Sequence, residues 1–273
     1  MYDAASIIMN SALLEAAIEL AKVTGGVAQE HFRKHIRGER LAVEWKNDGS
    51  PVSAADRAAE MAARAFVNAR FPEDGVLGEE MGEERPEAKR RWCIDPIDGT
   101  KSFLAGVPLW GSLVALVEGD QVLAGAAYFP ATEELIAAAP GMGCTTVGAP
   151  PGVSSIADLA RATILTTDER FPDAPECVDP WRALATRVNV SRSWGDCFGY
   201  YLVATGRAEV MSDGKLSPWD AACFLPIIEE AGGVFTDWFG RRTAFGRGVI
   251  ATNRACAAEA RRVLGVPFEE SAQ

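Results

Sequence analysis

The spacing of apolar residues changes twice along the chain, and this change restricts the folds that it can adopt. Residues 6–33 and 53–71 carry helical signals, and residues 75–147 carry short β-type runs. After the Gly- and Pro-rich stretch 148–153, short apolar runs alternate with helical segments, which favours an α/β arrangement. Because 148–153 has neither helical nor strand periodicity, it is the best candidate linker.

Individual elements follow from local signals. Apolar residues at three-to-four spacing predict a helix over about 6–33. The sequence Ser-Ala-Ala-Asp from Ser53 has the form of a capping box, so a second helix should run from there to about Phe71. The runs 109–117 and 122–128, with a turn between them, predict an antiparallel hairpin.

Composition excludes several classes of protein. The chain has 273 residues, of which 48% are hydrophobic and 24% charged, as in ordinary globular proteins. Its net charge of −11 should repel nucleic acid and anionic membranes. No apolar run is long enough for a membrane span, and residues 1–20 do not resemble a signal peptide. The six cysteines lack CxxC pairing, which favours reduced thiols and a cytoplasmic location.

The densest chemical signal is an apolar run that ends in two aspartates, Trp-Cys-Ile-Asp-Pro-Ile-Asp-Gly-Thr over 92–100. Asp95, the Ile97 carbonyl and Asp98 could supply three oxygen ligands to Mg²⁺ from one turn. A helix should open at Thr100, so N–H groups near Gly99 and Thr100 could face a phosphate. A simpler interpretation is that Asp98 caps this helix and Asp95 begins a turn.

Other acidic residues have similar double interpretations. Glu79 and Glu80 follow a short apolar run and a glycine, but adjacent glutamates are often only solubilising charge. Asp220 lies three residues after Ser217, and Asp56 three after Ser53, so each also fits a helix cap. Caps alone do not explain why so many acids stand at strand ends and helix starts, where they could converge on cations.

Alternative chemistry finds little support. His31 and His35 are the only histidines and do not form His-Glu-x-x-His. No Gly-x-Ser-x-Gly, Walker A or strand-preceded Gly-x-Gly-x-x-Gly sequence is present. The charged stretch 83–91 is expected to be a solvated loop before a strand.

Four blocks, in order, resemble the signature segments of the inositol monophosphatase-like family of metal-dependent phosphatases, and the resemblance covers about residues 5–265. The blocks are Lys46–Asp56, Gly78–Glu80, Asp95–Thr100 and Trp219–Gly233. The resemblance implies a layered α-β-α-β-α sandwich, combining α/β and α+β parts. It implies an N-terminal α+β domain over 1–150, a C-terminal α/β domain over 151–273, and an active site between them.

The resemblance also implies a set of metal ligands. Glu79, Asp95 and the Ile97 carbonyl would hold one Mg²⁺, and Asp95, Asp98 and Asp220 a second. Glu79 would bind a third, looser ion through water. Two or three Mg²⁺ ions are therefore expected.

The catalytic and phosphate-binding residues come from the same resemblance. Asp56 and Thr100 match the pair that orients and helps to deprotonate the attacking water, with Glu79 as a further catalytic residue. The amides of Gly99 and Thr100 match the phosphate cradle. Ser53 stands where many members of the family have threonine.

Within the family, segments 193–200, 204–211 and 216–220 most resemble the histidinol-phosphatase branch. An acidic side chain at Asp196 could pair with the amine of histidinol phosphate, although a turn or cap would also explain it. Asp213 stands where relatives often use a glutamate to contact the substrate.

The expected activity is Mg²⁺-dependent hydrolysis of L-histidinol phosphate to L-histidinol and phosphate in histidine biosynthesis. The alternatives are an inositol monophosphatase or a broad sugar-phosphate phosphatase, a non-catalytic metal or phosphate sensor, and a structural interaction module. The expected partner is a small phosphorylated metabolite rather than nucleic acid or a membrane, and a homodimer is compatible with the resemblance.

Overall fold

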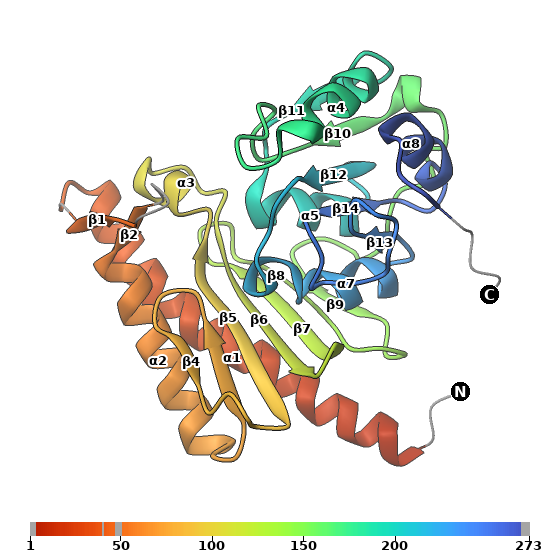
Figure 1. Cartoon of the computed structure of the whole chain (residues 1–273). Helices are drawn as coiled ribbons and strands as arrows, with labels where there is room; N and C mark the ends of the chain where they lie inside the picture. Colours follow the sequence, from red (N-terminus) through yellow and green to blue (C-terminus); the bar gives the residue numbers. More distant parts are fainter. Residues whose placement is uncertain (1–3, 40, 47–50, 269–273) are drawn as a thin grey trace.

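The computed structural model describes residues 4–39, 41–46 and 51–268, and the chain forms five layers in the order helix, sheet, helix, sheet, helix (Figure 1). The first layer consists of α1 (Ala4–Ile36) and α2 (Ala54–Arg70), which pack together on one face of the larger sheet. The expected layered α-β-α-β-α fold is therefore confirmed.

Both predicted N-terminal helices are confirmed, the first expected from its apolar spacing and the second from its capping box. Ser53 caps α2, since its hydroxyl accepts a hydrogen bond of 3.1 Å from the Ala55 N–H. Asp56 completes the capping box, because its carboxylate accepts a bond of 2.8 Å from the Ser53 N–H. Two short strands precede α2, β1 (Val43–Trp45) and β2 (Pro51–Ser53), and they pair in antiparallel fashion.

The larger sheet has seven strands in the order β4-β3-β5-β6-β7-β8-β9. All neighbours are antiparallel except β3 and β5, which run in parallel. The strands are β3 (Gly75–Gly78), β4 (Gly82–Glu84), β5 (Arg90–Asp98), β6 (Gly111–Glu118), β7 (Gln121–Phe129), β8 (Glu134–Ala138) and β9 (Cys144–Val147).

The predicted hairpin is the β6–β7 pair, and its turn lies at Gly119 and Asp120. The prediction of a solvated loop over 83–91 was wrong in part, because β4 ends within this stretch and β5 begins in it. Backbone pairing of Glu84 with Val76 extends the edge of the sheet into that charged segment.

Alternating side chains of β6 serve two separate cores. Val114 and Leu116 pack toward α1 and α2, whereas Leu113 and Ala115 pack toward the helices on the opposite face. A strand covered on both faces is apolar throughout, which explains why this run shows no polar alternation. The larger sheet is thus the second of the five layers.

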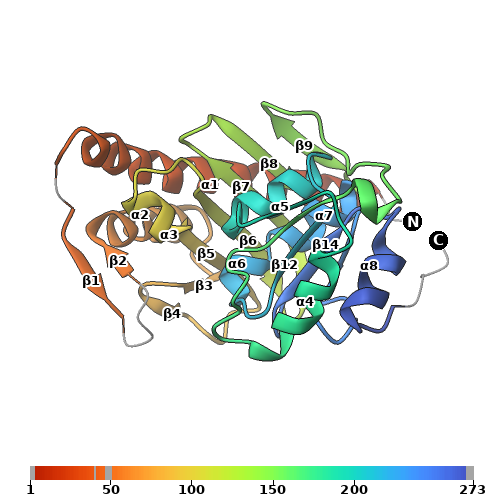
Figure 2. The same cartoon turned by 90° about the horizontal axis from the view of Figure 1, so that it is seen from above.

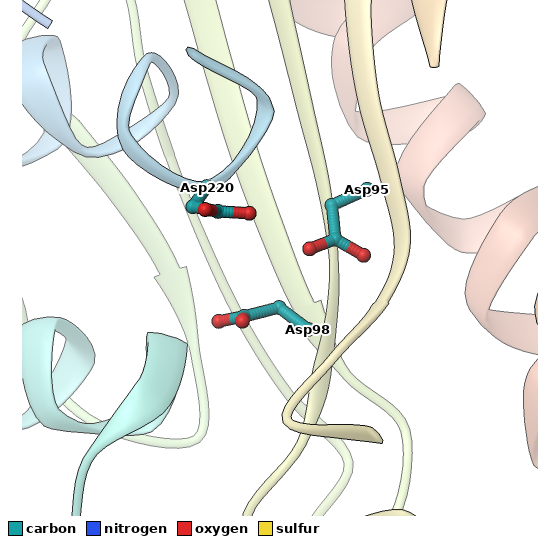
Figure 3. Close-up of side chains that lie close together, drawn as sticks. All are labelled: Asp95, Asp98 and Asp220. Atoms are coloured by element: carbon teal, nitrogen blue, oxygen red, sulfur yellow. The ribbon is translucent and has the colours of Figure 1, made fainter. Parts of the chain in front are cut away.

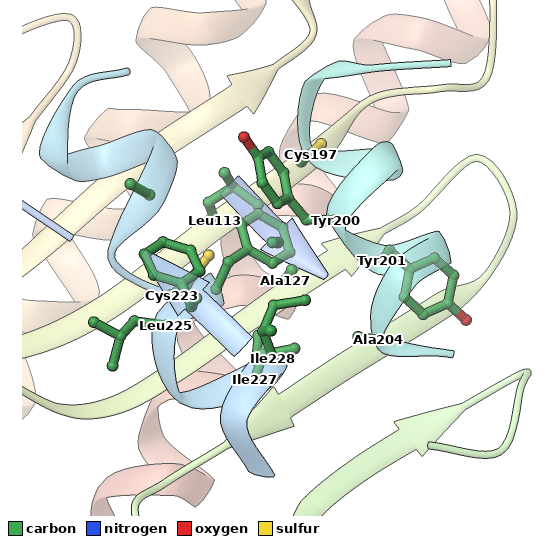
Figure 4. Close-up of a cluster of buried hydrophobic side chains, with 14 of the residues drawn as sticks. Leu113, Ala127, Cys197, Tyr200, Tyr201, Ala204, Cys223, Leu225, Ile227 and Ile228 are labelled. Carbon is green, nitrogen blue, oxygen red and sulfur yellow. The ribbon is translucent and has the colours of Figure 1, made fainter. Parts of the chain in front are cut away.

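The third layer lies between the two sheets and contains α5 (Asp196–Ala204), α6 (Pro218–Ala221) and α7 (Phe224–Glu230). Its apolar side chains, such as Tyr200 and Ile227, pack against Leu113 of β6 (Figure 4). The helical segment over 218–230 is divided, since α6 ends at Ala221 and α7 begins at Phe224.

The smaller sheet has five strands in the order β11-β10-β12-β14-β13. β10 runs parallel to β11 and β12, and the other neighbours are antiparallel. The strands are β10 (Thr163–Leu165), β11 (Val190–Arg192), β12 (Val210–Asp213), β13 (Val234–Thr236) and β14 (Val249–Thr252).

The fifth layer is formed by α4 (Val178–Ala185) and α8 (Ala257–Leu264), which lie side by side on the outer face of the smaller sheet (Figure 2). Two short 3₁₀ turns complete this half, η1 (Leu159–Arg161) and η2 (Pro175–Cys177). The predicted linker 148–153 directly follows β9 and contains no helix or strand. The domain boundary at 150 stays a prediction.

Among the described residues, no helix has the length and apolar character to cross a membrane.

The outer helical layer gives a direct test of packing. Leu184 of α4 is fully buried against the smaller sheet and α8. Leu184→Ala should lower the free energy of unfolding by about 2–5 kcal/mol, because it removes buried apolar contacts and leaves a cavity. Urea unfolding followed by circular dichroism measures this change. Met61→Ala, on an exposed site of α2, should change stability by less than about 0.5 kcal/mol; equal losses in both variants would contradict the described core.

Candidate active site

Two aspartates at the end of β5 face the same space, although their spacing would ordinarily separate them. Side chains alternate along a strand, so residues three apart normally point to opposite faces. The register between β5 and β6 shifts between Asp95 and Asp98, and the Ile97 N–H donates a bond of 2.9 Å to the Asp95 carboxylate. This irregularity turns the strand end so that both carboxylates converge (Figure 3).

Asp220 of α6 reaches the same space from the other half of the chain. Its Oδ2 atom accepts a hydrogen bond of 2.8 Å from the Ser217 N–H, as a helix cap would. Carboxylate oxygens of Asp95, Asp98 and Asp220 also lie within 4.8 Å of one another (Figure 3). One side chain therefore serves as a cap and as a member of an acidic cluster, and the two interpretations of Asp220 do not exclude each other.

The cluster is electrostatically unfavourable as it stands. Burial raises the pKa of Asp95 well above its usual value, and the charge of Glu79 raises it further. Burial and the neighbouring charge of Asp196 also raise the pKa of Asp98. Burial raises the pKa of Asp220 to about 7. Crowded carboxylates of this kind fit a divalent cation, because Mg²⁺ takes oxygen ligands and compensates the buried negative charge.

Glu79 lines the same pocket but lies outside the group of three aspartates. Its carboxylate accepts a hydrogen bond of 2.8 Å from Lys46 Nζ, which also donates to Glu80 at 2.8 Å. A cationic group thus stands against both glutamates. The ammonium of Lys46 therefore partly compensates the negative charge of the two glutamates.

Asp56 and Thr100 meet behind the cluster. Asp56 is fully buried, and its Oδ2 atom accepts bonds of 2.8 Å and 2.6 Å from the Ser53 N–H and hydroxyl. The Thr100 hydroxyl lies 3.5 Å from Asp56 Oδ1 and 3.0 Å from the Ile97 carbonyl oxygen. Thr100 lines the pocket whereas Asp56 does not, so Thr100 lies between the pocket and the Asp56 carboxylate.

The turn between β5 and α3 (Thr100–Leu104) depends on glycine. Gly99 has φ of 85°, in the left-handed region, and a Cβ there would lie 2.9 Å from the Leu109 carbonyl oxygen. The predicted helix start at Thr100 is confirmed. Gly99 and Thr100 line the pocket. The first N–H groups of α3 have no partner within the helix.

Asp196 and Asp213 face the pocket from the second half. The Asp196 N–H donates to the Thr167 hydroxyl at 2.8 Å, and Asp196 has φ of 49°. Asp213 accepts bonds from the Thr167 N–H at 2.9 Å and from the Tyr200 hydroxyl at 3.0 Å. Among the described residues, no donor bonds to the Asp196 carboxylate, whereas both oxygens of Asp213 are engaged.

The α5 start is also tied to the acidic cluster. The Cys197 N–H donates to Asp98 Oδ2, so a backbone group of α5 fixes an aspartate of β5. Burial raises the pKa of Asp196 to about 7, and the charge of Asp213 contributes. The whole arrangement surrounds a pocket of about 280 Å³.

Several residues of this pocket were not predicted from the sequence. They are Lys101, Thr167, Asp168, Asp173, Tyr200 and Lys215. Thr167 and Asp168 closely follow the apolar run of β10, so the strand-end signal that identified Asp95 could also have found them. The two histidines, His31 and His35, lie elsewhere, on α1, and His35 bonds the Leu104 carbonyl oxygen at 2.8 Å.

Comparisons with known proteins agree with this geometry. The family model described as "Inositol monophosphatase family" matches residues 9–265. A protein named histidinol-phosphatase from Chlorobaculum parvum is 43% identical over 244 residues, covering 89% of this chain and 92% of that protein.

Solved structures give the same answer. The extragenic suppressor protein suhB from Bartonella henselae has a TM-score of 0.85 at 26% identity, covering 96% of this chain and all of the other. An inositol monophosphatase from Zymomonas mobilis has a TM-score of 0.81 at 30% identity, covering 94% and 98%. The chain therefore belongs to the inositol monophosphatase family and is a phosphoric monoester hydrolase.

Proposed function

We propose that this protein is a Mg²⁺-dependent histidinol-phosphatase, which hydrolyses L-histidinol phosphate to L-histidinol and phosphate. The observation that carries the metal-dependent part is the cluster of Asp95, Asp98 and Asp220, with oxygens within 4.8 Å of one another. Asp95 is buried, and the other two are partly buried. Support for the substrate comes from the 43% identical relative of that name and from Asp196, which lines the pocket and whose carboxylate accepts no hydrogen bond from the described part of the chain.

The proposed ligands are those at the floor of the pocket. Glu79, Asp95, Asp98, Asp220 and the Ile97 carbonyl would hold two or three Mg²⁺ ions. When bound, such ions lower the pKa of a coordinated water, neutralise phosphate charge and stabilise the departing alkoxide. The residues fit this group because three carboxylates supply closely spaced oxygen ligands of the kind that Mg²⁺ prefers.

Other residues would orient the reactants. The Thr100 hydroxyl lies close enough to bond Asp56 or the Ile97 carbonyl. Thr100 and Asp56 together can therefore hold a water molecule and receive its proton. Two bonds from Ser53 keep Asp56 in place while its Oδ1 atom faces Thr100. Amides of Gly99 and Thr100 would bind the phosphate oxygens.

The pocket carries acidic groups that suit the ammonium end of histidinol phosphate. Beyond the proposed metal ligands, it is lined by four aspartates and two lysines. These are Asp168, Asp173, Asp196, Asp213, Lys101 and Lys215. Asp196 would accept a hydrogen bond from the ammonium of histidinol phosphate, and Asp213 would hold the Thr167 backbone beside it.

An inositol or sugar phosphate is the alternative substrate, favoured by the 30% identical inositol monophosphatase structure. Such substrates present hydroxyls to Asp196 rather than an ammonium. A sensor without turnover and an interaction module are disfavoured, because the chain is a phosphoric monoester hydrolase by family.

A cytoplasmic location is also proposed, since all six cysteines are free.

Metal dependence gives the first test of this proposal. Purified protein should release phosphate from L-histidinol phosphate with Mg²⁺, lose this activity in EDTA, and regain it when Mg²⁺ is restored. Asp220→Asn should lower kcat/KM by at least about 100-fold, because a neutral amide is a weaker Mg²⁺ ligand than a carboxylate. The bound ions are what stabilise the negative charge of the reacting phosphate and of the departing alkoxide. An amide oxygen can still accept the Ser217 bond, which preserves the cap.

Asp158→Asn is the matched control, since Asp158 is also an acidic cap, of η1, and does not line the pocket. It should keep near-wild-type activity. Turnover that persists in EDTA, or equal losses in both variants, would contradict the proposed metal site.

Substrate preference gives the second test. Wild-type kcat/KM should be higher for L-histidinol phosphate than for inositol 1-phosphate and fructose 1,6-bisphosphate. Asp196→Asn should reduce the histidinol phosphate value by about 10–100-fold, because a charge-assisted hydrogen bond contributes roughly 1.5–3 kcal/mol. Asparagine is the suitable replacement because it tolerates the left-handed backbone of this position.

Asp168→Asn is its control, since that pocket aspartate is already paired with Arg170. It should leave the preference unchanged. Equal rates on all three substrates would remove the substrate assignment, and an unchanged preference in Asp196→Asn would remove the ammonium contact.

A further inference from the structure

We propose that Glu60 is a positioning residue that fixes the backbone after β3 and thereby presents Glu79 to the metal cluster. The inference rests on the proposed metal-dependent function, and it assigns a role to a buried carboxylate that touches neither the pocket nor the three aspartates. Glu60 lies on α2 and is completely buried.

The Glu60 carboxylate accepts hydrogen bonds from the turn that follows β3. Its Oε2 atom accepts from the Glu80 N–H at 2.8 Å, and its Oε1 atom from the Met81 N–H at 3.1 Å. These are the two backbone groups directly after Glu79. Glu60 thus holds the backbone on the C-terminal side of the proposed ligand.

Strand pairing holds the other side. The Glu79 N–H donates to the Ile94 carbonyl oxygen at 3.2 Å, and Gly78 is the register partner of Ile94 in the parallel β3–β5 pair. Glu79 therefore stands beside Asp95, the next residue of β5. With both flanking segments fixed, the main chain of Glu79 has a defined position relative to the cluster.

Gly78 shows how closely Glu60 approaches this turn. A Cβ at position 78 would lie 2.2 Å from Glu60 Oε1 and 2.5 Å from its carboxyl carbon. The backbone conformation of Gly78 does not demand glycine, since its φ is not positive. Glycine is needed here because the Glu60 carboxylate occupies the space that a side chain would fill.

Arg64 completes the support and explains why position 60 carries an acid. Its Nε atom donates to Glu60 Oε1 at 2.8 Å, and its Nη2 atom donates to the Gly82 carbonyl oxygen at 2.6 Å. Glu60 therefore accepts from three N–H donors and its charge is paired. A glutamine would turn its own NH₂ group toward one of these donors and lose that bond.

The side chains of the turn remain available for ligands. Glu79 and Glu80 use their carboxylates only with Lys46 among the described hydrogen bonds, while Glu60 bonds their backbone. One turn of α2 separates Glu60 from Asp56, so both acids project from the same face of the helix. A single helix face thus orients the proposed water-binding pair and the Glu79 turn.

The alternative is that Glu60 contributes only to stability. The two roles differ in what they change: a positioning role alters metal affinity, whereas lost stability alone does not. Glu60→Gln should raise the Mg²⁺ dissociation constant about 10–100-fold, as for other residues that orient metal ligands. Saturating Mg²⁺ should restore most of kcat. Isothermal titration calorimetry and phosphate release measure the two quantities.

Gly78→Ala tests the same contact from the other side, because its methyl group must displace the Glu60 carboxylate. It should give the same weaker Mg²⁺ binding with recoverable kcat. Gly26→Ala is the matched control, since a Cβ at Gly26 meets no atom within 4 Å. Leu184→Ala is the stability control, and it should lower stability without changing Mg²⁺ affinity.

Hydrogen exchange of the metal-free protein provides a readout independent of metal. In Glu60→Gln the Glu80 or the Met81 amide, whichever faces the new NH₂ group, should exchange at least about 10-fold faster, because the hydrogen bond it loses is worth about 1.5 kcal/mol when the acceptor is charged. Amides within α2 should keep their protection. Unchanged exchange at Glu80 and Met81, or wild-type Mg²⁺ affinity in both Glu60→Gln and Gly78→Ala, would overturn this inference alone. A wild-type protein that binds no Mg²⁺ would overturn the proposed function as well.

Discussion

Mutual repulsion among buried carboxylates is the constraint on which the rest of the site depends. Asp95 and Asp98 come from β5 and Asp220 from α6, so the first and second halves of the chain contribute to one cluster. Burial and neighbouring charge raise the pKa of each of these groups. Such a cluster destabilises the folded chain unless protons or cations compensate it, and the fold must hold it together by other contacts.

Those contacts are mainly backbone hydrogen bonds to the acids themselves. The Ile97 N–H bonds Asp95, the Cys197 N–H bonds Asp98, and the Ser217 N–H bonds Asp220. Each bond fixes a carboxylate without neutralising it, because an amide carries no net charge. The cluster is therefore held in a fixed arrangement, and its oxygens remain available as ligands for hard cations.

Local signals in the sequence predicted much of this arrangement. The capping box at Ser53 and the glycine turn after Asp98 each depend on neighbouring residues, and both are confirmed. The layer order depends on how distant segments pack, so local signals could not predict it. It was predicted only from the resemblance of four sequence blocks to one family. Spacing alone could not show that Asp95 and Asp98 converge, since the register shift arises from pairing with β6.

Long-range contacts account for what the sequence did not reveal. The Thr167 N–H reaches the Asp213 carboxylate because β10, which precedes Thr167, pairs with β12, which carries Asp213. Glu60 has no distinguishing feature in the sequence, since an acid in a helix is ordinarily solvent-exposed. The break between α6 and α7 does have a signal in the sequence, because Pro226 lacks an N–H and is tolerated in the first turn of a helix but not in its interior.

The central claim is that divalent cations bind between Asp95, Asp98 and Asp220. A crystal structure of the protein soaked with Mn²⁺, measured at the manganese absorption edge, tests it most directly. The account predicts anomalous peaks within about 2–2.5 Å of oxygens from all three carboxylates, with a further ion adjacent to Glu79. Saturating Mn²⁺ that leaves no peak at these carboxylates, or a peak held only by other residues, would contradict it.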